Sequence, residues 1–107
     1  MKEQRQAASD DVMAHLAGLR NGMSAEERAT YDERVLAIRT VLELVEQRKK
    51  RRLPQRTIAD RMGVSQPVIA RLEKPLESSW RQPSLSVLSR YAAALGLVLE
   101  VRLRPAA

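Results

Sequence analysis

Apolar and polar residues follow the period of about 3.6 that amphipathic helices show along most of this chain. The earliest such stretch ends at Asn21-Gly22, where a helix is expected to stop. Residues 9–11 (Ser-Asp-Asp) suit its start, because serine caps helices and acidic side chains are favourable at the positive end of the helix dipole. Its apolar stripe consists of Val12, Leu16 and Leu19.

A longer helix is predicted to follow, because Ser24-Ala-Glu-Glu27 has the pattern of a capping box, in which serine and glutamate satisfy each other's free amides. Its apolar residues recur at steps of four and three, as in a helix with one broad buried face. They are Tyr31, Val35, Ile38, Leu42 and Val45, with Val41 and Leu44 widening the stripe. This repeat covers about two heptads, fewer than a secure coiled coil needs, so packing against other helices of the chain is the preferred interpretation.

Residues 55–73 have the pattern of two short helices joined by a tight turn. Gly63 can adopt the left-handed conformation that ends a helix, and Ser65 can cap the next one. The apolar residues that would face each other are Ile58, Ala59 and Met62 before the turn and Val64, Ile69 and Leu72 after it. The pattern predicts a helix-turn-helix, with a purely structural helical hairpin as the alternative.

A loop over residues 74–83 and a last helix are predicted next. Trp80, the only tryptophan, is expected to anchor the loop to the core, and a tryptophan that faces a partner is the alternative. The last helix should begin after the cap Ser84 and end at Gly96. Its predicted buried stripe is Leu85, Leu88, Tyr91, Ala92 and Leu95.

The period then changes to two over residues 97–104, which predicts a β-strand that Pro105 stops. The apolar Leu97, Leu99, Val101 and Leu103 alternate with Val98, Glu100, Arg102 and Arg104. No second strand-like segment exists in the sequence, and a lone strand leaves its backbone groups unpaired. We therefore expect this strand to pair antiparallel with its copy around a two-fold axis, as a dimer strand.

The expected fold is all-α: a helix-turn-helix bundle of about five helices with one C-terminal β-strand that pairs across a dimer. A chain of 107 residues is long enough for one domain with one modest core. Residues 1–23 would be an N-terminal helical extension. Residues 24–107 would form the helix-turn-helix domain, including the dimerisation strand 97–104.

Charge is distributed unevenly along the chain. Residues 1–47 contain six basic and nine acidic side chains, a net charge of −3, whereas residues 48–107 contain thirteen basic and four acidic ones, a net charge of +9. A surface that binds a polyanion is therefore expected in the second half. The basic run at residues 48–52 lies just before the helix-turn-helix, where phosphate contact and a solvated helix end are both open interpretations.

Several classes of function have no support in the sequence. Without cysteine there is neither a disulfide framework nor a thiolate metal site, which fits a reducing compartment, so the cytoplasm is expected. No apolar run approaches the roughly 20 residues that span a bilayer, and the polar start is no signal peptide. The lone His15 and the lack of a glycine-rich phosphate loop argue against an enzyme, a metal site or a cofactor.

The helix-turn-helix resembles that of the Cro and phage-repressor (XRE) family, in which a glutamine opens the first helix and a Ser-Gln pair opens the second, here Gln55 and Ser65-Gln66. The resemblance implies a lambda-repressor-like bundle whose second helix enters the major groove of double-stranded operator DNA. Pro54 departs from the family's usual Ser or Thr, and the loop 74–83 is longer than usual.

The face of the second helix opposite Ile69 and Leu72 would read base edges through Gln66, Pro67, Ala70 and Arg71. Arg71 suits guanine, Gln66 suits adenine, and the other two suit a thymine methyl group. The alternative for Arg71 is a surface ion pair with Glu73 or Glu77. The resemblance places Gln55 on a phosphate, and the other expected phosphate contacts are Arg56, Lys74, Arg51 and Arg52.

Residues 83–96 closely resemble the last helix of HigA-type antitoxins of toxin-antitoxin pairs. This resemblance implies a dimeric repressor that controls its own operon and neutralises a cognate toxin, a ribonuclease that cleaves mRNA. The toxin would bind the N-terminal helices or another surface away from the DNA face. A stand-alone regulator without a toxin, and a protein-interaction module that does not read DNA, are the alternatives.

Overall fold

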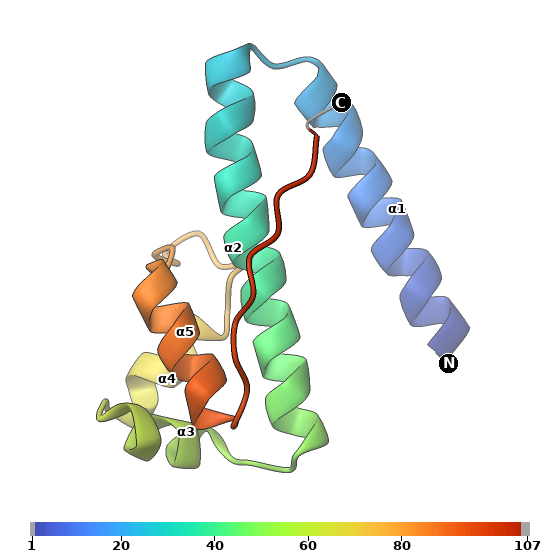
Figure 1. The fold of residues 1–107 in the computed structure, drawn as a ribbon. Coiled ribbons are helices and arrows are strands. Elements are labelled where there is room, and N and C mark those ends of the chain that lie inside the picture. Colours follow the sequence, from blue (N-terminus) through green and yellow to red (C-terminus); the bar gives the residue numbers. More distant parts are fainter. Residues whose placement is uncertain (1, 106–107) are drawn as a thin grey trace. The chain divides into compact units, whose positions relative to one another are not determined.

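The computed structural model describes residues 2–105, with side chains from residue 10 onward. Its described part is all helical (Figure 1), with the helices α1 (Lys2–Asn21), α2 (Ala25–Lys50), α3 (Gln55–Met62), α4 (Gln66–Leu72) and α5 (Leu85–Ala94). None of these helices has both the length and the apolar character needed to cross a membrane. The chain divides into two compact units, residues 1–35 and residues 36–107.

The first unit contains α1 and the beginning of α2. The predicted start of α1 at residues 9–11 is wrong, because the helix already begins at Lys2. Lysine, glutamate, glutamine, arginine and alanine, all good helix formers, fill residues 2–8 and let the helix extend upstream. The capping box is confirmed: the amide of Ser24 donates to Glu27 Oε1 (3.3 Å), and the amide of Glu27 donates to Ser24 Oγ (3.2 Å).

Two polar contacts join α1 to the beginning of α2. The guanidinium of Arg20 donates to both carboxylate oxygens of Asp32, at 2.7 and 3.0 Å, and the hydroxyl of Tyr31 donates to the carbonyl of Leu16 at 2.9 Å. Val12 and Leu19 of the predicted apolar stripe are exposed.

The second unit has one aliphatic core with two buried aromatic rings. Its buried members are Ala37, Val41 and Leu44 of α2, Ile58 and Ala59 of α3, Ile69 of α4, Trp80, and Leu88, Tyr91, Ala92, Ala94 and Leu95. The buried face of α2 differs from the predicted stripe, because Val41 and Leu44 are at its centre while Leu42 is exposed. The same face continues to Arg48, which is also buried.

Both predicted anchors of the last helix and its loop are present. The hydroxyl of Ser84 accepts a hydrogen bond from the amide of Val87 at 3.2 Å, so Ser84 caps α5 as predicted. Trp80 is buried, and its Nε1 donates to the carbonyl of Leu72 at 2.9 Å, which ties the loop to the end of α4. Leu85, predicted to be buried, is exposed in the first turn of α5.

Residues 97–104 are the main departure from the predicted fold, because the described chain contains no β-strand. The segment leaves α5 through Gly96, which has a left-handed φ of 76°, and follows α2 as an extended chain (Figure 1). Leu97 and Leu99 pack partly against the core, whereas Val101 and Leu103 are exposed. A strand is defined by hydrogen bonds to a neighbouring strand, and the described chain offers none.

Candidate nucleic-acid interface

The turn between α3 and α4 depends on Gly63, whose φ of 71° and ψ of 30° are left-handed. Its amide donates to the carbonyl of Asp60 (3.2 Å), and the amide of Val64 donates to the carbonyl of Ala59 (3.0 Å). These two bonds form a Schellman motif, which confirms the predicted role of Gly63. The chain then enters α4, which packs against α3 above the fully buried Ile58 and Ile69.

Ser65 is the N-cap residue of α4 by position, but its hydroxyl makes no capping hydrogen bond. The predicted side-chain cap is therefore wrong. A capping oxygen bonds the amide of the second or third helical residue. Here the second is Pro67, which has no amide hydrogen, and the amide of Val68 donates instead to the backbone carbonyl of Ser65 at 3.1 Å.

The four residues predicted to read bases lie on the outer side of α4. Gln66, Pro67 and Arg71 are exposed and Ala70 is half-buried, while Ile69 on the opposite side is 0% exposed. Ile69 therefore packs α4 onto the aliphatic core, and the face formed by the four predicted residues remains accessible. An accessible face of this kind is what major-groove recognition requires.

Arg71 makes no ion pair within the described residues, although Glu73 and Glu77 both lie near it in sequence. Glu73 is held by Arg48, and Glu77 lies 3.9 Å from the ammonium group of Lys74. The surface ion pair considered as an alternative for Arg71 is therefore not formed. Its five N–H donors remain available to a ligand.

A chain of side-chain amides positions Gln66. Its Nε2 donates to Gln55 Oε1 at 2.8 Å, and Gln55 Nε2 donates to Glu73 Oε1 at 2.9 Å. Gln55 therefore links the first helix of the motif to both ends of the second. This positioning role of Gln55 was not predicted from the sequence, and its phosphate contact stays a prediction.

Glu73 is the centre of a buried polar network. Arg48 donates to it through Nε (2.8 Å to Oε2) and Nη2 (2.7 Å to Oε1), a bidentate pair whose side chains are 11% and 5% exposed for Arg48 and Glu73. The hydroxyl of Tyr91 also donates to Glu73, and Arg48 Nη1 donates to the carbonyl of Leu53 at 2.8 Å. The network joins α2, α3, α5 and the end of α4 through one carboxylate.

The network also sets the protonation of its members. Burial alone would raise the pKa of Glu73, but the hydrogen bonds from Arg48, Tyr91 and Gln55 outweigh it and hold this pKa below its ordinary value. Burial, together with the hydrogen bond to Glu73, raises the pKa of the Tyr91 hydroxyl. Near neutral pH, Glu73 is therefore an ionised carboxylate that accepts a hydrogen bond from the neutral hydroxyl of Tyr91.

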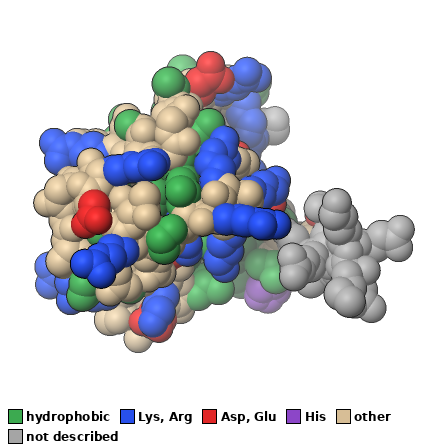
Figure 2. Space-filling view, turned by 90° about the horizontal axis from the view of Figure 1, so that it is seen from below, with side chains coloured by type: hydrophobic (Ala, Val, Ile, Leu, Met, Phe, Trp, Pro, Cys, Tyr) green, Lys and Arg blue, Asp and Glu red, His purple; other side chains and the backbone are tan. Residues whose placement is uncertain are grey.

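Arg48 was one of five basic residues considered for phosphate contact, and the structure excludes it because its guanidinium is buried. Arg51, Arg52, Arg56 and Lys74 are exposed. Figure 2 shows Lys and Arg side chains spread over the face that carries α3 and α4, with few acidic ones among them. This distribution matches the charge of a surface that contacts phosphates.

Arg52 is the one non-glycine residue of the described chain with a positive φ, at 55°. It ends α2 in a Schellman motif, since its own amide donates to the carbonyl of Lys49 (3.0 Å) and the amide of Leu53 donates to the carbonyl of Arg48 (3.1 Å). Glycine is the residue that adopts this conformation at least cost. Arg52 therefore occupies a position whose backbone conformation costs more for arginine than for glycine.

The network of Arg48, Glu73 and Tyr91 was not predicted from the sequence. A signal was present, because Ala37, Val41, Leu44 and Arg48 follow steps of four, three and four on α2. An arginine on such a buried face needs a carboxylate partner. Glu73 directly after the second helix of the motif was the available candidate.

Comparison with known families gives one match. A family model described as helix-turn-helix matches residues 44–100, more than half of the chain, from the end of α2 through α5. No curated protein and no solved structure matches the chain significantly.

Proposed function

Because the chain belongs to the XRE-type helix-turn-helix family, whose domains are DNA-binding regulators, we propose that it represses transcription by placing α4 in the major groove of an operator. The observation that carries this proposal is the accessible face formed by Gln66, Pro67, Ala70 and Arg71 above the buried Ile69. Such a face can reach base edges while the rest of the unit remains rigid.

Each residue of this face has a chemical role in the proposal. The guanidinium of Arg71 can donate two parallel hydrogen bonds to O6 and N7 of guanine, and the amide of Gln66 can bond adenine. Pro67 and Ala70 can contact a thymine methyl group. Arg51, Arg52, Arg56 and Lys74, with Gln55, would hold the phosphate backbone and thereby fix the register of α4 without reading sequence.

We further propose that two copies bind together through residues 97–104. Two recognition helices would then lie about 34 Å apart and read a palindrome from one side of the duplex. The extended conformation of the segment and its apolar residues Val101 and Leu103, both exposed, support pairing with a second chain.

The antitoxin role is the finer part of the proposal, and the resemblance of residues 83–96 supports it. The N-terminal helices would bind a ribonuclease toxin, and their acidic side chains suit a basic partner. A co-expression experiment with the product of the neighbouring reading frame tests this role. Growth arrest by that product alone, relieved by this protein, supports the antitoxin, whereas the lack of a toxic neighbour favours a stand-alone regulator.

The test of base reading begins with selection of an operator from random duplexes by the purified protein. Binding to the selected site and to random DNA is then measured by fluorescence anisotropy for wild type, Arg71→Ala and the control Arg39→Ala. The control removes the same charge from an exposed position on α2, outside the helix-turn-helix. We expect Arg71→Ala to weaken binding to the selected site by about 1–3 kcal/mol, with a much smaller loss on random DNA.

Two results would favour the remaining alternative, a protein-interaction module. One is the failure of selection to enrich any sequence. The other is equal affinity of wild type and Arg71→Ala for selected and random DNA.

A further inference from the structure

The C-terminal segment, residues 97–104, is extended and partly unpacked. No backbone hydrogen bond joins residues 98–104 to the rest of the described chain. Val98, Val101 and Leu103 are 89%, 65% and 97% exposed. Extended backbone with free amides, free carbonyls and exposed β-branched or leucine side chains is a template for pairing with another strand.

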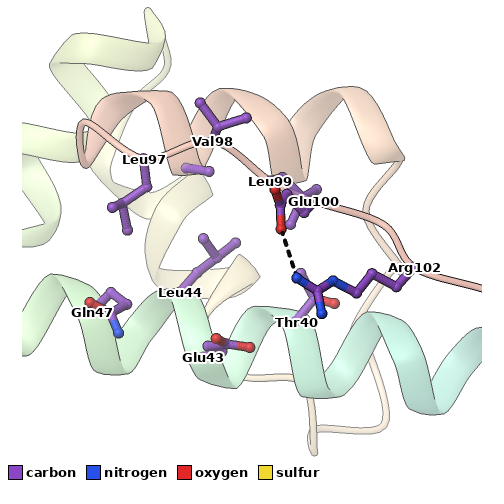
Figure 3. Close-up of a pocket in the computed structure, with 10 residues that line it drawn as sticks. Thr40, Glu43, Leu44, Gln47, Leu97, Val98, Leu99, Glu100 and Arg102 are labelled. Atoms are coloured by element: carbon purple, nitrogen blue, oxygen red, sulfur yellow. Dashed lines mark ion pairs between the residues drawn. The ribbon is translucent and has the colours of Figure 1, made fainter.

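An open groove of about 510 Å³ runs beside this segment (Figure 3). Thr40, Leu44 and Gln47 of α2 form one side of it, and Leu97, Glu100 and Arg102 of the segment form the other. Residues 97–102 therefore border an open groove and are only partly packed against the core. A second extended chain has room to approach it.

Two charged side chains of the segment, those of Glu100 and Arg102, lie close together. The guanidinium of Arg102 is 3.7 Å from the carboxylate of Glu100, and both side chains are largely exposed (Figure 3). Residues two apart share one face of an extended chain. Leu97 and Leu99, which precede this pair in the sequence, pack partly against the core, whereas Val101 between the two charged residues is exposed. When the segment is paired as a strand, its alternating sequence would put Glu100 and Arg102 on one face and Leu99, Val101 and Leu103 on the other.

We infer that a second copy of this chain pairs antiparallel with residues 97–104 in the register that places Val101 on the two-fold axis. This inference rests on the proposed dimer and specifies its geometry. In this register Glu100 lies opposite Arg102 of the second copy, and symmetry forms this charge pair twice. On the apolar face, Leu99 lies opposite Leu103 of the second copy. Opposite charges and apolar side chains directly across two strands both stabilise a sheet.

Other positions of the two-fold axis give less favourable cross-strand pairs of the same residues. An axis at Glu100 sets two glutamates against each other, and an axis at Arg102 sets two arginines against each other; like charges directly opposite destabilise a sheet. An axis at Leu99 or Leu103 forms no opposite-charge pair. An axis between two residues places apolar side chains opposite charged ones, which mixes the two faces.

Single-cysteine variants locate the axis directly, because the natural chain has no cysteine. Cysteine is placed in turn at Leu99, Glu100, Val101, Arg102 and Leu103 of the full chain, and disulfide formation is followed under mild oxidation. We expect Val101→Cys to cross-link fastest, because residues on the axis have Cα atoms about 4.5–5.5 Å apart. Residues two positions away lie roughly 14 Å from their copies along the strand, beyond the reach of a disulfide.

Charge reversal provides an independent test. Glu100→Arg and Arg102→Glu are each expected to weaken the dimer by roughly five- to thirtyfold, since each variant places like charges opposite one another twice. A mixture of the two single variants should form heterodimers in preference to either homodimer, because both opposite-charge pairs are restored between chains. The ion pair within one chain cannot produce that result. The dissociation constants come from analytical ultracentrifugation, and the mixture is analysed by native mass spectrometry.

The outcomes separate the register from the proposed function. Fastest cross-linking at Val101 together with preferred heterodimers supports the inference. Fastest cross-linking at another position, or a dimer that ignores both charge reversals, overturns this register but leaves the dimeric regulator intact. A monomer at micromolar concentration overturns the register and the proposed dimer together, while the selection experiment on operator DNA decides base reading separately.

Discussion

The buried pair of Arg48 and Glu73 gives the strongest prediction about stability. Glu73→Gln keeps the size of the side chain but removes the negative charge, so the guanidinium of Arg48 remains buried without a counter-ion. The glutamine keeps one acceptor oxygen, for which Arg48 and Tyr91 would compete. An uncompensated buried charge is strongly destabilising, whereas the loss of an exposed pair costs little.

The magnitude follows from the burial of the pair, since the side chains of Arg48 and Glu73 are only 11% and 5% exposed. Removal of one partner from a buried pair costs about 3–5 kcal/mol. A unit of about 70 residues has a free energy of unfolding of roughly 4–11 kcal/mol. Glu73→Gln should therefore remove a large part of the stability, and at about 4–8 °C per kcal/mol it should lower Tm by at least about 12 °C.

Urea denaturation followed by tryptophan fluorescence measures this loss, because the single indole of Trp80 is buried beside the end of α4. The matched control is Glu77→Gln, whose exposed carboxylate lies 3.9 Å from Lys74. We expect the control to change the free energy of unfolding by less than about 0.5 kcal/mol. A loss below about 1 kcal/mol for Glu73→Gln, at unchanged m-value, would show that the Arg48 pair is solvated and the network absent.

Four further predictions concern single residues. Arg52→Gly should raise the free energy of unfolding by about 1 kcal/mol, because glycine adopts the positive φ without strain. The same variant should lower DNA affinity at low salt and reduce the slope of log affinity against log salt concentration by about one phosphate contact. An unchanged slope would exclude that contact. Because the pKa of Glu73 is lower in the folded protein than in the unfolded chain, its ionised carboxylate stabilises the fold fully at pH values above the ordinary carboxyl pKa. This contribution is lost as the pH falls through the pKa of the folded state. Acid titration of Glu73→Gln should lack this loss. Because the pKa of Tyr91 is raised in the folded protein, the free energy of unfolding should decline as the pH rises above the ordinary phenol pKa of about 10. Tyr91→Phe should reduce this decline when unfolding is followed by circular dichroism. Trp80→Ala should destabilise the unit by about 3–5 kcal/mol, because the buried indole anchors the loop. Urea denaturation followed by circular dichroism measures this, and a loss near zero would refute the anchoring role.

Local signals explain why much of the fold could be predicted from the sequence. Gly63, the capping box at Ser24 and Glu27, and the cap at Ser84 each act within a few residues, so their geometry follows from sequence spacing. The outward face of α4 could also be predicted from the sequence, because the apolar Ile69 and Leu72 indicated which side of the helix packs on the core.

The features that could not be predicted depend on residues far away in the sequence or on groups outside the described chain. Glu73 pairs with Arg48, twenty-five residues away, and no periodicity relates the two. The burial of α2 is centred on Val41 and Leu44 rather than Leu42 because the partners across the core, including this network, select one side of a broad apolar stripe. The strand predicted at residues 97–104 is not formed, because the described chain offers no second extended segment to which its backbone could hydrogen-bond.

A test of the proposed contact between Arg71 and guanine is the most direct test of base reading. Each guanine of the selected operator is replaced in turn by 7-deazaguanine, which lacks the N7 acceptor, and affinity is measured by anisotropy for wild type and Arg71→Ala. We expect one symmetric pair of guanines at which the replacement weakens wild-type binding but leaves the binding of Arg71→Ala unchanged. If no guanine shows this dependence, or if Arg71→Ala remains as sensitive as wild type, the outer face of α4 does not read DNA through Arg71.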